Sequence, residues 1–364
     1  MKRSTKAAVL NLADFEALAK KRLPKALFEH TAGGAEDEIT LRDNVAAFQR
    51  LKIIPRVLRN ITDRKTDTTV LGQPVSFPVL IAPMACLRRF HPQGELAVAR
   101  AASKAGTISI ISTGACYGFK KIAEAARGSA WLQLYAYRDK AVTQGLVEGA
   151  EAAGYKAICI TVDVPVDGNR ERDVRNRYYY PREMLYQNLK ELGVKGVSRE
   201  MNEAELLAFA GRKLRVALTW EYLEWLKTIT KLPLVLKGIL SPQDAARAVS
   251  SGINGIIVSN HGGRQLDGSP ASIDALSEIA KAVDGHIEIF LDSGIRRGTD
   301  VLRAVALGAR AVLLGRPCAW ALTVDGERGV SRVLEILQKE FSTAMALAGC
   351  AGVAEITADL VHAR

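Results

Sequence analysis

The chain of 364 residues has few cysteines and few aromatic side chains, and each shortage excludes a class of protein. Its five cysteines lie far apart, form no CxxC pair and have no histidine at ligand spacing. This pattern argues against a disulfide framework and a zinc site, and it is typical of reduced core cysteines in a cytosolic protein. Aromatic residues, at 6%, do not interleave with a basic stripe. Nucleic acid is therefore not predicted as a partner, although the net charge is +11.

Long apolar runs are also missing. No stretch approaches the roughly 20 residues that a membrane span needs. The basic start, Met1 to Lys6, precedes an apolar stretch that is too short for a signal peptide. A cytoplasmic protein is therefore expected. With 48% hydrophobic and 24% charged residues the composition is that of a globular chain with a large core, and the excess of positive charge favours phosphates or acidic substrates as partners.

The sequence does have a repeated alternation of short apolar runs and helical patterns. Eight apolar runs are strand candidates: 79–82, 108–111, 131–134, 157–162, 234–237, 255–258, 287–291 and 311–314. The intervening helix candidates are 94–105, 122–126, 140–153, 222–228, 242–250, 273–283, 299–307 and 330–347, and several end in a small residue followed by glycine. This repeat, at roughly 25-residue spacing, predicts a single (β/α)8 TIM barrel that includes the whole chain, residues 1–364. A Rossmann sheet is disfavoured because no GxGxxG follows the first strand.

Two segments fall outside the repeat. Residues 1–78 are expected to form a helical and hairpin extension, with a helix from Leu12 capped by Asp14, a glycine hinge after His30, and a hairpin around residues 71–74 that closes the barrel. The insertion 164–219 after the fourth strand is expected to be a lid. Its basic, partly apolar second half also suggests contact with a membrane surface, but its apolar stripe is short for an interfacial helix.

The stretch SNHGGRQLDG, residues 259–268, follows the sixth predicted strand. It places His261, which can accept a proton, three residues from Arg264, which can hold a carboxylate. The alternative is that both side chains only satisfy hydrogen bonds of the turn. In a barrel, however, the ends of several strands meet at one rim, where ligands bind. Asp163, at the end of the fourth strand, would then orient His261 and favour its imidazolium form.

Glycine and arginine recur after the last two strands. Gly294 and Arg296 follow the seventh strand, and Gly315 and Arg316 follow the eighth. In barrels this is a recurrent phosphate site, because glycine allows close backbone approach and arginine supplies charge. A phosphate-bearing cofactor or substrate is expected there, and Lys237 at the end of the fifth strand could stabilise an anionic group on it.

The stretch 259–268 closely resembles a motif of the FMN-dependent 2-hydroxy acid oxidase and dehydrogenase family, and so do ITVDVP, LQLYAY, LVLKGI, FLDSGIRRGTDVLRAVALGA and LGRP. The family includes glycolate oxidase, lactate oxidase and mandelate dehydrogenase. The resemblance extends from about Leu12 to the C-terminus. It implies FMN at the barrel mouth, oxidation of an S-2-hydroxy acid to a 2-keto acid, oxygen, a quinone or another electron acceptor, and a homotetramer. No metal is implied.

The resemblance also assigns roles to residues. It implies a catalytic group of His261 as base, Asp163 as its charge partner, Tyr135 and Arg264. The substrate-binding residues would be His30, Gly114, Tyr135, Arg170 and Arg264. The FMN contacts would be Ala82, Pro83, Met84, Ser112, Gln133, Thr161, Lys237, Ser259, Asp292, Gly294, Arg296, Gly315 and Arg316.

Three positions depart from the family pattern. His30 stands where relatives usually have a tyrosine that helps to hold the substrate carboxylate, Gly114 replaces a bulky tryptophan of glycolate oxidase, and Met84 replaces a threonine near the flavin. These departures favour a substrate larger than glycolate. They also admit a hydroxy lactone, an ester or a modified peptide without a free carboxylate. A flavin-binding protein without turnover is a third hypothesis, which the joint presence of His261, Asp163, Arg264 and Tyr135 disfavours.

Overall fold

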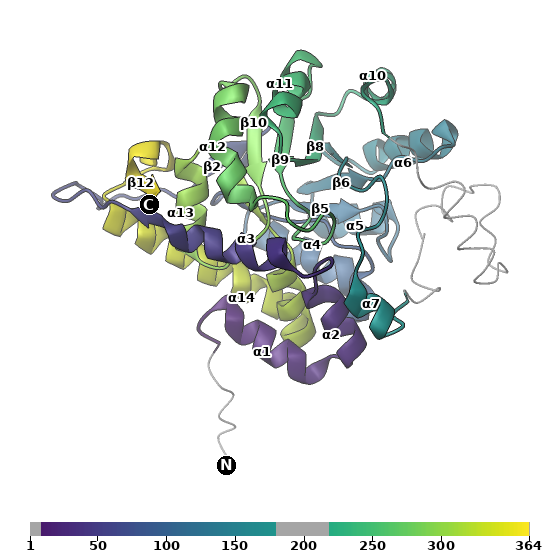
Figure 1. Ribbon diagram of the computed structural model, residues 1–364, viewed down its shortest axis with the longest axis horizontal. Coiled ribbons are helices and arrows are strands. Elements are labelled where there is room, and N and C mark those ends of the chain that lie inside the picture. The colour runs from purple at the N-terminus through teal and green to yellow at the C-terminus, as the bar shows by residue number, and fades with distance from the viewer. Residues whose placement is uncertain (1–8, 180–217, 364) are drawn as a thin grey trace, which may run out of the picture.

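Eight parallel strands close into a barrel at the centre of the computed structural model, which describes residues 9–179 and 218–363 (Figure 1). The strands are β4 (Val79–Ile81), β5 (Ser109–Ser112), β6 (Ala130–Leu134), β7 (Ile158–Thr161), β8 (Leu234–Ile239), β9 (Gly255–Val258), β10 (Glu288–Leu291) and β11 (Ala311–Leu314). They pair in chain order, and β11 returns to β4. The predicted (β/α)8 barrel is confirmed, with each strand where the apolar pattern placed it.

Helices follow the strands and surround the barrel (Figure 1). They are α4 (Gly94–Lys104), α5 (Phe119–Ala126), α6 (Lys140–Ala152), α10 (Trp220–Ile229), α11 (Pro242–Ser250), α12 (Ser272–Val283), α13 (Gly298–Ala306) and α14 (Arg316–Ala348). The last begins at Arg316 rather than at the expected residue 330. Pro317 stands in the first turn, where a helix tolerates proline. The helix is interrupted further on, by non-helical backbone at Asp325 and Gly326.

Two apolar layers hold the barrel together. Inward-facing residues such as Trp131, Phe290 and Leu313 fill the interior, and Trp131 meets Phe290 edge to face with ring centroids 5.8 Å apart. Outward-facing strand residues pack against the surrounding helices in a second, larger core. Each strand therefore buries both faces, which explains its continuous apolar sequence.

The N-terminal extension differs from its prediction in detail. α1 (Leu12–Arg22) is capped by Asn11, whose side chain accepts from the backbone of Ala13 and Asp14. The predicted cap, Asp14, instead accepts from the Asn11 backbone N–H, in a capping box. Pro24 then separates α1 from a further helix, α2 (Lys25–Ala32), which α3 (Ile39–Arg50) follows after the glycine hinge.

A hairpin closes the amino end of the barrel, as predicted. β2 (Thr68–Val70) and β3 (Gln73–Val75) pair antiparallel, and Val70 and Val75 join the interior core. At the opposite end of the chain β12 (Val361–Ala363) pairs with β1 (Leu51–Ile53). The N-terminal extension therefore contacts the barrel through the β2–β3 hairpin, and it contacts the C-terminal residues through the β1–β12 pair.

The long insertion is described only in part. Residues 164–179 contain the short helix α7 (Glu171–Arg175), and short 3-10 turns occur at η1 (Leu87–Arg89), η3 (Val353–Glu355) and η4 (Ala358–Leu360). The basic and aromatic half of the expected lid, residues 180–217, lies outside the described residues. Within the described part, no helix is long and apolar enough to cross a membrane, and no cluster of three metal-ligating side chains occurs.

Candidate active site

One side chain position from each barrel strand faces inward at the carboxyl end of the barrel. These positions are Ala82, Ser112, Gln133, Thr161, Lys237, Ser259, Asp292 and Gly315, and we call them the inner layer. Each follows an inward apolar residue by two positions, as Gln133 follows Trp131 and Asp292 follows Phe290. Because successive side chains of a strand alternate between faces, this spacing brings all of them to one level. All were predicted as cofactor contacts, and the barrel brings them together.

Hydrogen bonds join neighbours within the inner layer. Gln133 links Ser112 and Thr161, accepting from Ser112 Oγ at 3.0 Å and donating through Nε2 to Thr161 Oγ1 at 2.9 Å. Across the barrel, Lys237 Nζ lies 2.9 Å from Ser259 Oγ and 3.0 Å from Asp292 Oδ2. Burial opposes the charge of Lys237, but Asp292 and Asp163 hold its pKa above the ordinary value. The layer thus offers a polar surface with one permanent cation, which suits a planar ring with an anionic edge.

His261 lies beside this layer, bonded to Asp163. Its Nδ1 is 3.0 Å from Asp163 Oδ1, and its backbone adopts φ 57°, which turns the loop sharply after β9. Burial lowers the pKa of His261, against the opposing effect of the Asp163 charge. Burial would raise the pKa of Asp163, but the charges of His261 and Lys237 keep it below its ordinary value. A neutral imidazole with Nδ1–H donated to a carboxylate has a basic Nε2, as a general base requires.

Two residues that the sequence did not single out fix Asp163. Gly238 has φ 114°, and a Cβ there would lie 2.5 Å from Cβ of Asp163, so only glycine leaves room for the carboxylate. Gln265 donates to the Asp163 carbonyl at 3.0 Å and to the Val166 carbonyl at 2.8 Å. Gly238 lies where the pairing register between β8 and β9 shifts, between Lys237 and Ile239. The sequence pattern did not predict this shift.

The two arginines predicted on the substrate side are bonded to backbone and loop groups, and the charge of Arg264 acts on His261. Arg264 Nη1 donates to the carbonyls of His30 at 2.5 Å and Gly33 at 3.1 Å. Arg170 Nη2 donates to Gln265 Oε1 at 3.1 Å, and its Nε donates to the Arg264 carbonyl at 3.3 Å. These bonds attach both the glycine hinge and the loop after β7 to the loop after β9.

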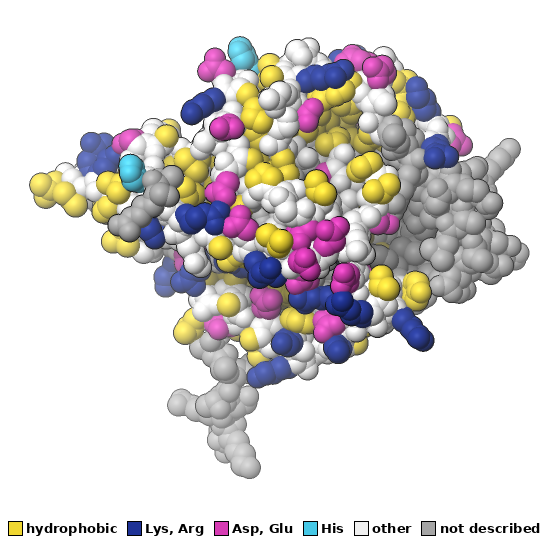
Figure 2. Space-filling model, viewed as in Figure 1, with side chains coloured by type: hydrophobic (Ala, Val, Ile, Leu, Met, Phe, Trp, Pro, Cys, Tyr) yellow, Lys and Arg dark blue, Asp and Glu magenta, His cyan; other side chains and the backbone are white. Residues whose placement is uncertain are grey.

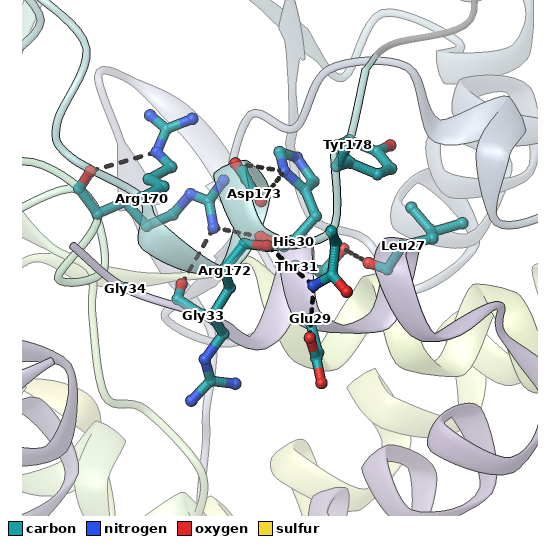
Figure 3. Close-up of polar contacts among 12 residues, drawn as sticks. Leu27, Glu29, His30, Thr31, Gly33, Gly34, Arg170, Arg172, Asp173 and Tyr178 are labelled. Atoms are coloured by element: carbon teal, nitrogen blue, oxygen red, sulfur yellow. Dashed lines mark hydrogen bonds and ion pairs between the residues drawn. The ribbon is translucent and has the colours of Figure 1, made fainter. Parts of the chain in front are cut away.

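His30 lies within α2 and is buried, with 4% of its surface exposed. Its Nδ1 is 2.9 Å from both carboxylate oxygens of Asp173, and its ring stacks on Tyr178 with centroids 4.2 Å apart (Figure 3). Burial, together with the charges of Arg264 and Arg89, lowers the pKa of His30 to about 4. The side chain is therefore neutral near pH 7 and does not face solvent.

Polar bonds around His30 attach α2 to α7. Asn176 Nδ2 donates to Glu29 at 2.5 Å, and Arg172 pairs with Glu38 at 2.5 Å. Acidic and basic side chains alternate on the surface where α2, α3 and α7 meet (Figure 2). The start of the insertion is thereby fixed to the N-terminal extension.

The remaining predicted residues of the substrate side and of the cofactor side lie on the loops after β4, β5 and β6. Tyr135 is half-buried, and its backbone N–H donates to Thr113 Oγ1 at 3.2 Å. A Cβ on Gly114 would lie 3.0 Å from Cβ of Ala85, so the space at Gly114 is bounded by a second small residue. Pro83 and Met84 are half-buried directly beyond β4, and Met84 packs against the outer core.

The predicted phosphate residues separate into two kinds. A Cβ on Gly315 would meet only Ala82, at 3.9 Å, so space is open before the first turn of α14. Burial and the like charges of Arg264 and Arg296 lower the pKa of Arg316, which indicates crowded cations that an anion would relieve. Gly294, by contrast, is required by packing, because its Cβ would lie 1.9 Å from the carbonyl oxygen of Asn44 in α3. Arg316 itself donates to the carbonyls of Thr31, Gly33 and Gly262.

Sequence reasoning missed several residues that shape the site: Arg89, Asp173, Tyr178, Gly238 and Gln265. Asp173 lies three residues beyond Arg170, so its nearness in sequence to a predicted residue was the available signal. Gly238 and Gln265 directly follow the predicted residues Lys237 and Arg264, so the same signal was available for them. Arg89 and Tyr178 had no such signal, because their partners are far away in the chain. Asn44 and Asn260 form a further reciprocal buried pair at 2.7 and 2.9 Å that fixes α3 to the loop after β9.

The barrel, the inner layer and the His261–Asp163 pair form a site that can hold a planar, phosphate-bearing cofactor beside a base. A family model described as FMN-dependent dehydrogenase matches residues 19–363. The chain is 48% identical over 357 residues to an L-lactate oxidase of Nostoc sp., covering 97% of this chain and 98% of the relative. It is 49% identical over 353 residues to 2-Hydroxyacid oxidase 1 of Homo sapiens, covering 96% and 95%. A crystal structure of a mandelate oxidase superposes with a TM-score of 0.90 at 42% identity, covering 98% and 99%.

The chain therefore belongs to the FMN-dependent dehydrogenase family. It is an FMN-dependent enzyme that oxidises the CH–OH group of 2-hydroxy acids and passes the electrons to an acceptor. The residues present fit FMN. The inner layer would hold the ring, with Lys237 at its anionic edge, and the open space at Gly315 beside crowded arginines would hold the phosphate.

Proposed function

We propose that this enzyme oxidises S-2-hydroxy acids larger than glycolate to 2-keto acids, with His261 as the base. The observation that supports it is the His261–Asp163 pair, in which a neutral imidazole is held by a buried carboxylate next to the inner layer. Bound FMN supplies a two-electron acceptor at its N5 atom. The family chemistry is oxidation of 2-hydroxy acids. What is proposed for this chain is the base, His261, and the size of the substrate.

The residues of the site divide the work. Nε2 of His261 accepts a proton from the substrate, and Asp163 stabilises the resulting imidazolium and keeps the ring in one tautomer. Asp163 Oδ2 is buried without a hydrogen-bond partner, so its charge acts on the imidazole with little screening. Arg264 and Arg170 provide the positive charge that attracts a carboxylate, and Tyr135 lies beyond β6 to bond the reacting hydroxyl.

The preference for larger substrates rests on two positions. Gly114 has no side chain where glycolate oxidase has a bulky tryptophan, and Ala85 lies close beside it, since a Cβ on Gly114 would be 3.0 Å from Cβ of Ala85. His30 is uncharged and its Nδ1–H is donated to Asp173, so it adds no further cation for a small carboxylate. A larger substrate compensates by burying apolar area, at roughly 25 cal/mol per Å².

A substrate series tests this proposal. Glycolate, lactate, longer aliphatic 2-hydroxy acids and S-mandelate are mixed anaerobically with the enzyme, and flavin reduction is followed by absorbance. We expect kcat/KM to rise from glycolate to the bulkier acids. A maximum at glycolate would contradict the size preference, and no reduction by any of these acids would contradict hydroxy acid oxidation by this chain. Repeating turnover with oxygen and with a dye identifies the acceptor.

The uncharged His30 favours one second candidate, a hydroxy lactone, ester or modified peptide without a free carboxylate. Pantolactone and the methyl ester of the best acid are included in the same series. Faster flavin reduction by these neutral compounds than by the acids would establish the second candidate in place of the first.

A further inference from the structure

The loop that carries His261 packs against α3 of the N-terminal extension. The side chain of Asp267, in this loop, accepts from the backbone N–H groups of the first two residues of α3, at 3.1 and 2.8 Å. About one turn further along the helix, Asn44 forms two hydrogen bonds with Asn260, the residue directly before His261. The loop after β9 is therefore attached to α3 at two places.

The backbone of residues 261–263 lies in the left-handed region, with φ of 57°, 69° and 72°. Two of these residues are glycines, which adopt this conformation readily, but His261 is not. A side-chain-bearing residue stays in the left-handed region only where the surrounding structure holds it there. The direction of the His261 side chain therefore depends on the contacts that hold this turn.

Three consecutive backbone N–H groups hold the turn by donating to side-chain oxygens. The donors are residues 261, 262 and 263, and the acceptors are, in that order, Ser259 Oγ, Ser293 Oγ and Asn260 Oδ1, each at 3.0 Å. The two serines are held from the inner layer, since their hydroxyls bond to Lys237 and Asp292. Asn260 is held from outside the barrel, by α3.

Asn260 uses all the hydrogen-bonding positions of its side chain. Its Oδ1 accepts from the Gly263 N–H and from Asn44 Nδ2, the latter at 2.9 Å. Its Nδ2 donates to Asn44 Oδ1 at 2.7 Å and to the Pro270 carbonyl at 3.0 Å. A carboxamide offers two donors and two acceptor positions, so Asn44 supplies half of the bonds. Both amides are buried, with 2% and 5% exposed, so removing Asn44 would leave a buried donor and a buried acceptor of Asn260 unsatisfied.

We propose that Asn44 is a positioning residue for the base: through Asn260 it holds the turn 261–263 in the conformation that directs His261 beside the inner layer. The inference rests on the proposed function, in which His261 accepts the substrate proton. Both amides are neutral, so the contribution of Asn44 is to the geometry of the base. The rate of the reaction then depends on a side chain of the N-terminal extension.

Asn44→Ala tests the proposal, with Asn254→Ala as the matched control. Asn254 precedes the same strand, β9, and accepts from the Leu234 backbone N–H at 2.8 Å, at the opposite end of the barrel. The FMN-loaded variants are mixed anaerobically with the best 2-hydroxy acid of the substrate series, and stopped-flow absorbance follows flavin reduction. Asn44→Ala should slow the saturating rate by roughly 10- to 100-fold, as is typical when a catalytic group moves by about 1 Å. The control should keep the wild-type rate although it also loses a hydrogen bond.

Two readouts separate positioning from a purely structural role. In a His261→Asn background, Asn44→Ala should slow flavin reduction by less than about twofold further, because a residue that acts through the base has no effect once the base is gone. KM should change much less than the saturating rate, because Arg264 is held separately by the carbonyls of His30 and Gly33.

A wild-type saturating rate in Asn44→Ala overturns the proposal, and so does a loss that is equal with and without His261. FMN content and the thermal midpoint are measured first for every variant. If Asn44→Ala does not retain FMN, Asn44→Ser replaces it and is judged by the same rates. A serine variant that also loses FMN would assign the amide pair to folding and overturn the proposal.

Failure of the proposed function gives a different result. It shows as absent flavin reduction in the wild-type enzyme, or as a His261→Asn enzyme with the wild-type rate. Failure of the present inference shows as a wild-type rate in Asn44→Ala beside a slow His261→Asn enzyme.

Discussion

The predicted cofactor side and the predicted substrate side of the site are built in different ways. The inner layer takes one residue from each barrel strand, and its side chains bond to neighbours on adjacent strands. The α2–α7 contact takes His30, Asp173, Tyr178 and Arg89 from helices and loops that meet only in the folded chain. A change in the first disturbs barrel strands, whereas a change in the second leaves the barrel intact.

Charge is also distributed differently. In the inner layer Lys237 is paired with Asp292, so a buried cation is balanced by a buried anion. Around His30, the positive charges of Arg264 and Arg89 help to keep the imidazole neutral, and only Asp173 opposes them. The inner layer should therefore be insensitive to pH near neutrality, whereas the α2–α7 contact should weaken in acid.

The largest expected effect lies between the two regions, at His261. Replacing it with asparagine keeps a polar side chain but removes the base, so flavin reduction should slow by roughly 10²–10⁴-fold while FMN stays bound. Stopped-flow absorbance measures the rate, and FMN content is measured after denaturation. His286→Asn, at an exposed position, is the control. A His261→Asn enzyme that reduces its flavin at the wild-type rate would falsify the assignment.

Gly238→Ala should have the next largest effect, because it displaces Asp163. We expect roughly a 10²-fold loss of kcat/KM, as is typical when a catalytic group moves by about 1 Å. Gly252→Ala is a matched control, since that glycine also has positive φ, 67°, but nothing lies within 4 Å of its Cβ. Both variants should lose stability through backbone strain, and only Gly238→Ala should lose activity. Equal activity in the two variants would show that the close packing at residue 238 does not position Asp163.

Asp163→Asn should shift the pH dependence of the reaction. Burial already lowers the pKa of His261, so the acid limb of kcat/KM in the wild-type enzyme should lie below the ordinary value of about 6.5. Removing the carboxylate removes the main influence that raises this pKa, so the limb should move to still lower pH. The maximal rate should fall roughly 10- to 100-fold, as expected for a lost charge-assisted hydrogen bond. A limb that moves upward would contradict this electrostatic account.

The last expected effect concerns stability in acid rather than catalysis. His30 has a pKa of about 4 in the folded protein against 6.5 when unfolded, so the unfolded state binds more protons between these values. The free energy of unfolding should therefore fall as the pH drops from 6.5 toward 4, by about 2–3 kcal/mol at the acid end. Urea unfolding at pH 7, 6, 5 and 4.5 measures it, and His30→Gln should flatten the dependence. An identical slope in the variant would assign the acid sensitivity to other groups.

The eight apolar runs and the helical patterns between them predicted the barrel, and the rule that strand ends meet at one rim predicted where Gln133, Thr161 and Lys237 lie. In the structure, inward positions follow a period of two residues, so Gln133 and Asp292 lie one inward step beyond Trp131 and Phe290. The glycine steps before the buried strands were likewise predictable, and residues 106, 154, 252 and 308 all have positive φ. In these cases each residue and its role lie within one local pattern.

The sequence by itself thus determined the barrel, the level of the inner layer and the nearness of His261, Arg264 and Asp163 to one rim. Only the tertiary structure decided that His30 is buried against Asp173 and Tyr178, that Gly294 serves packing against Asn44, and that Gly238 makes room for Asp163. The physical reason is one of range. Strand and helix periods are set by neighbours along the chain, whereas these contacts depend on how helices and loops that are distant in sequence pack against the barrel.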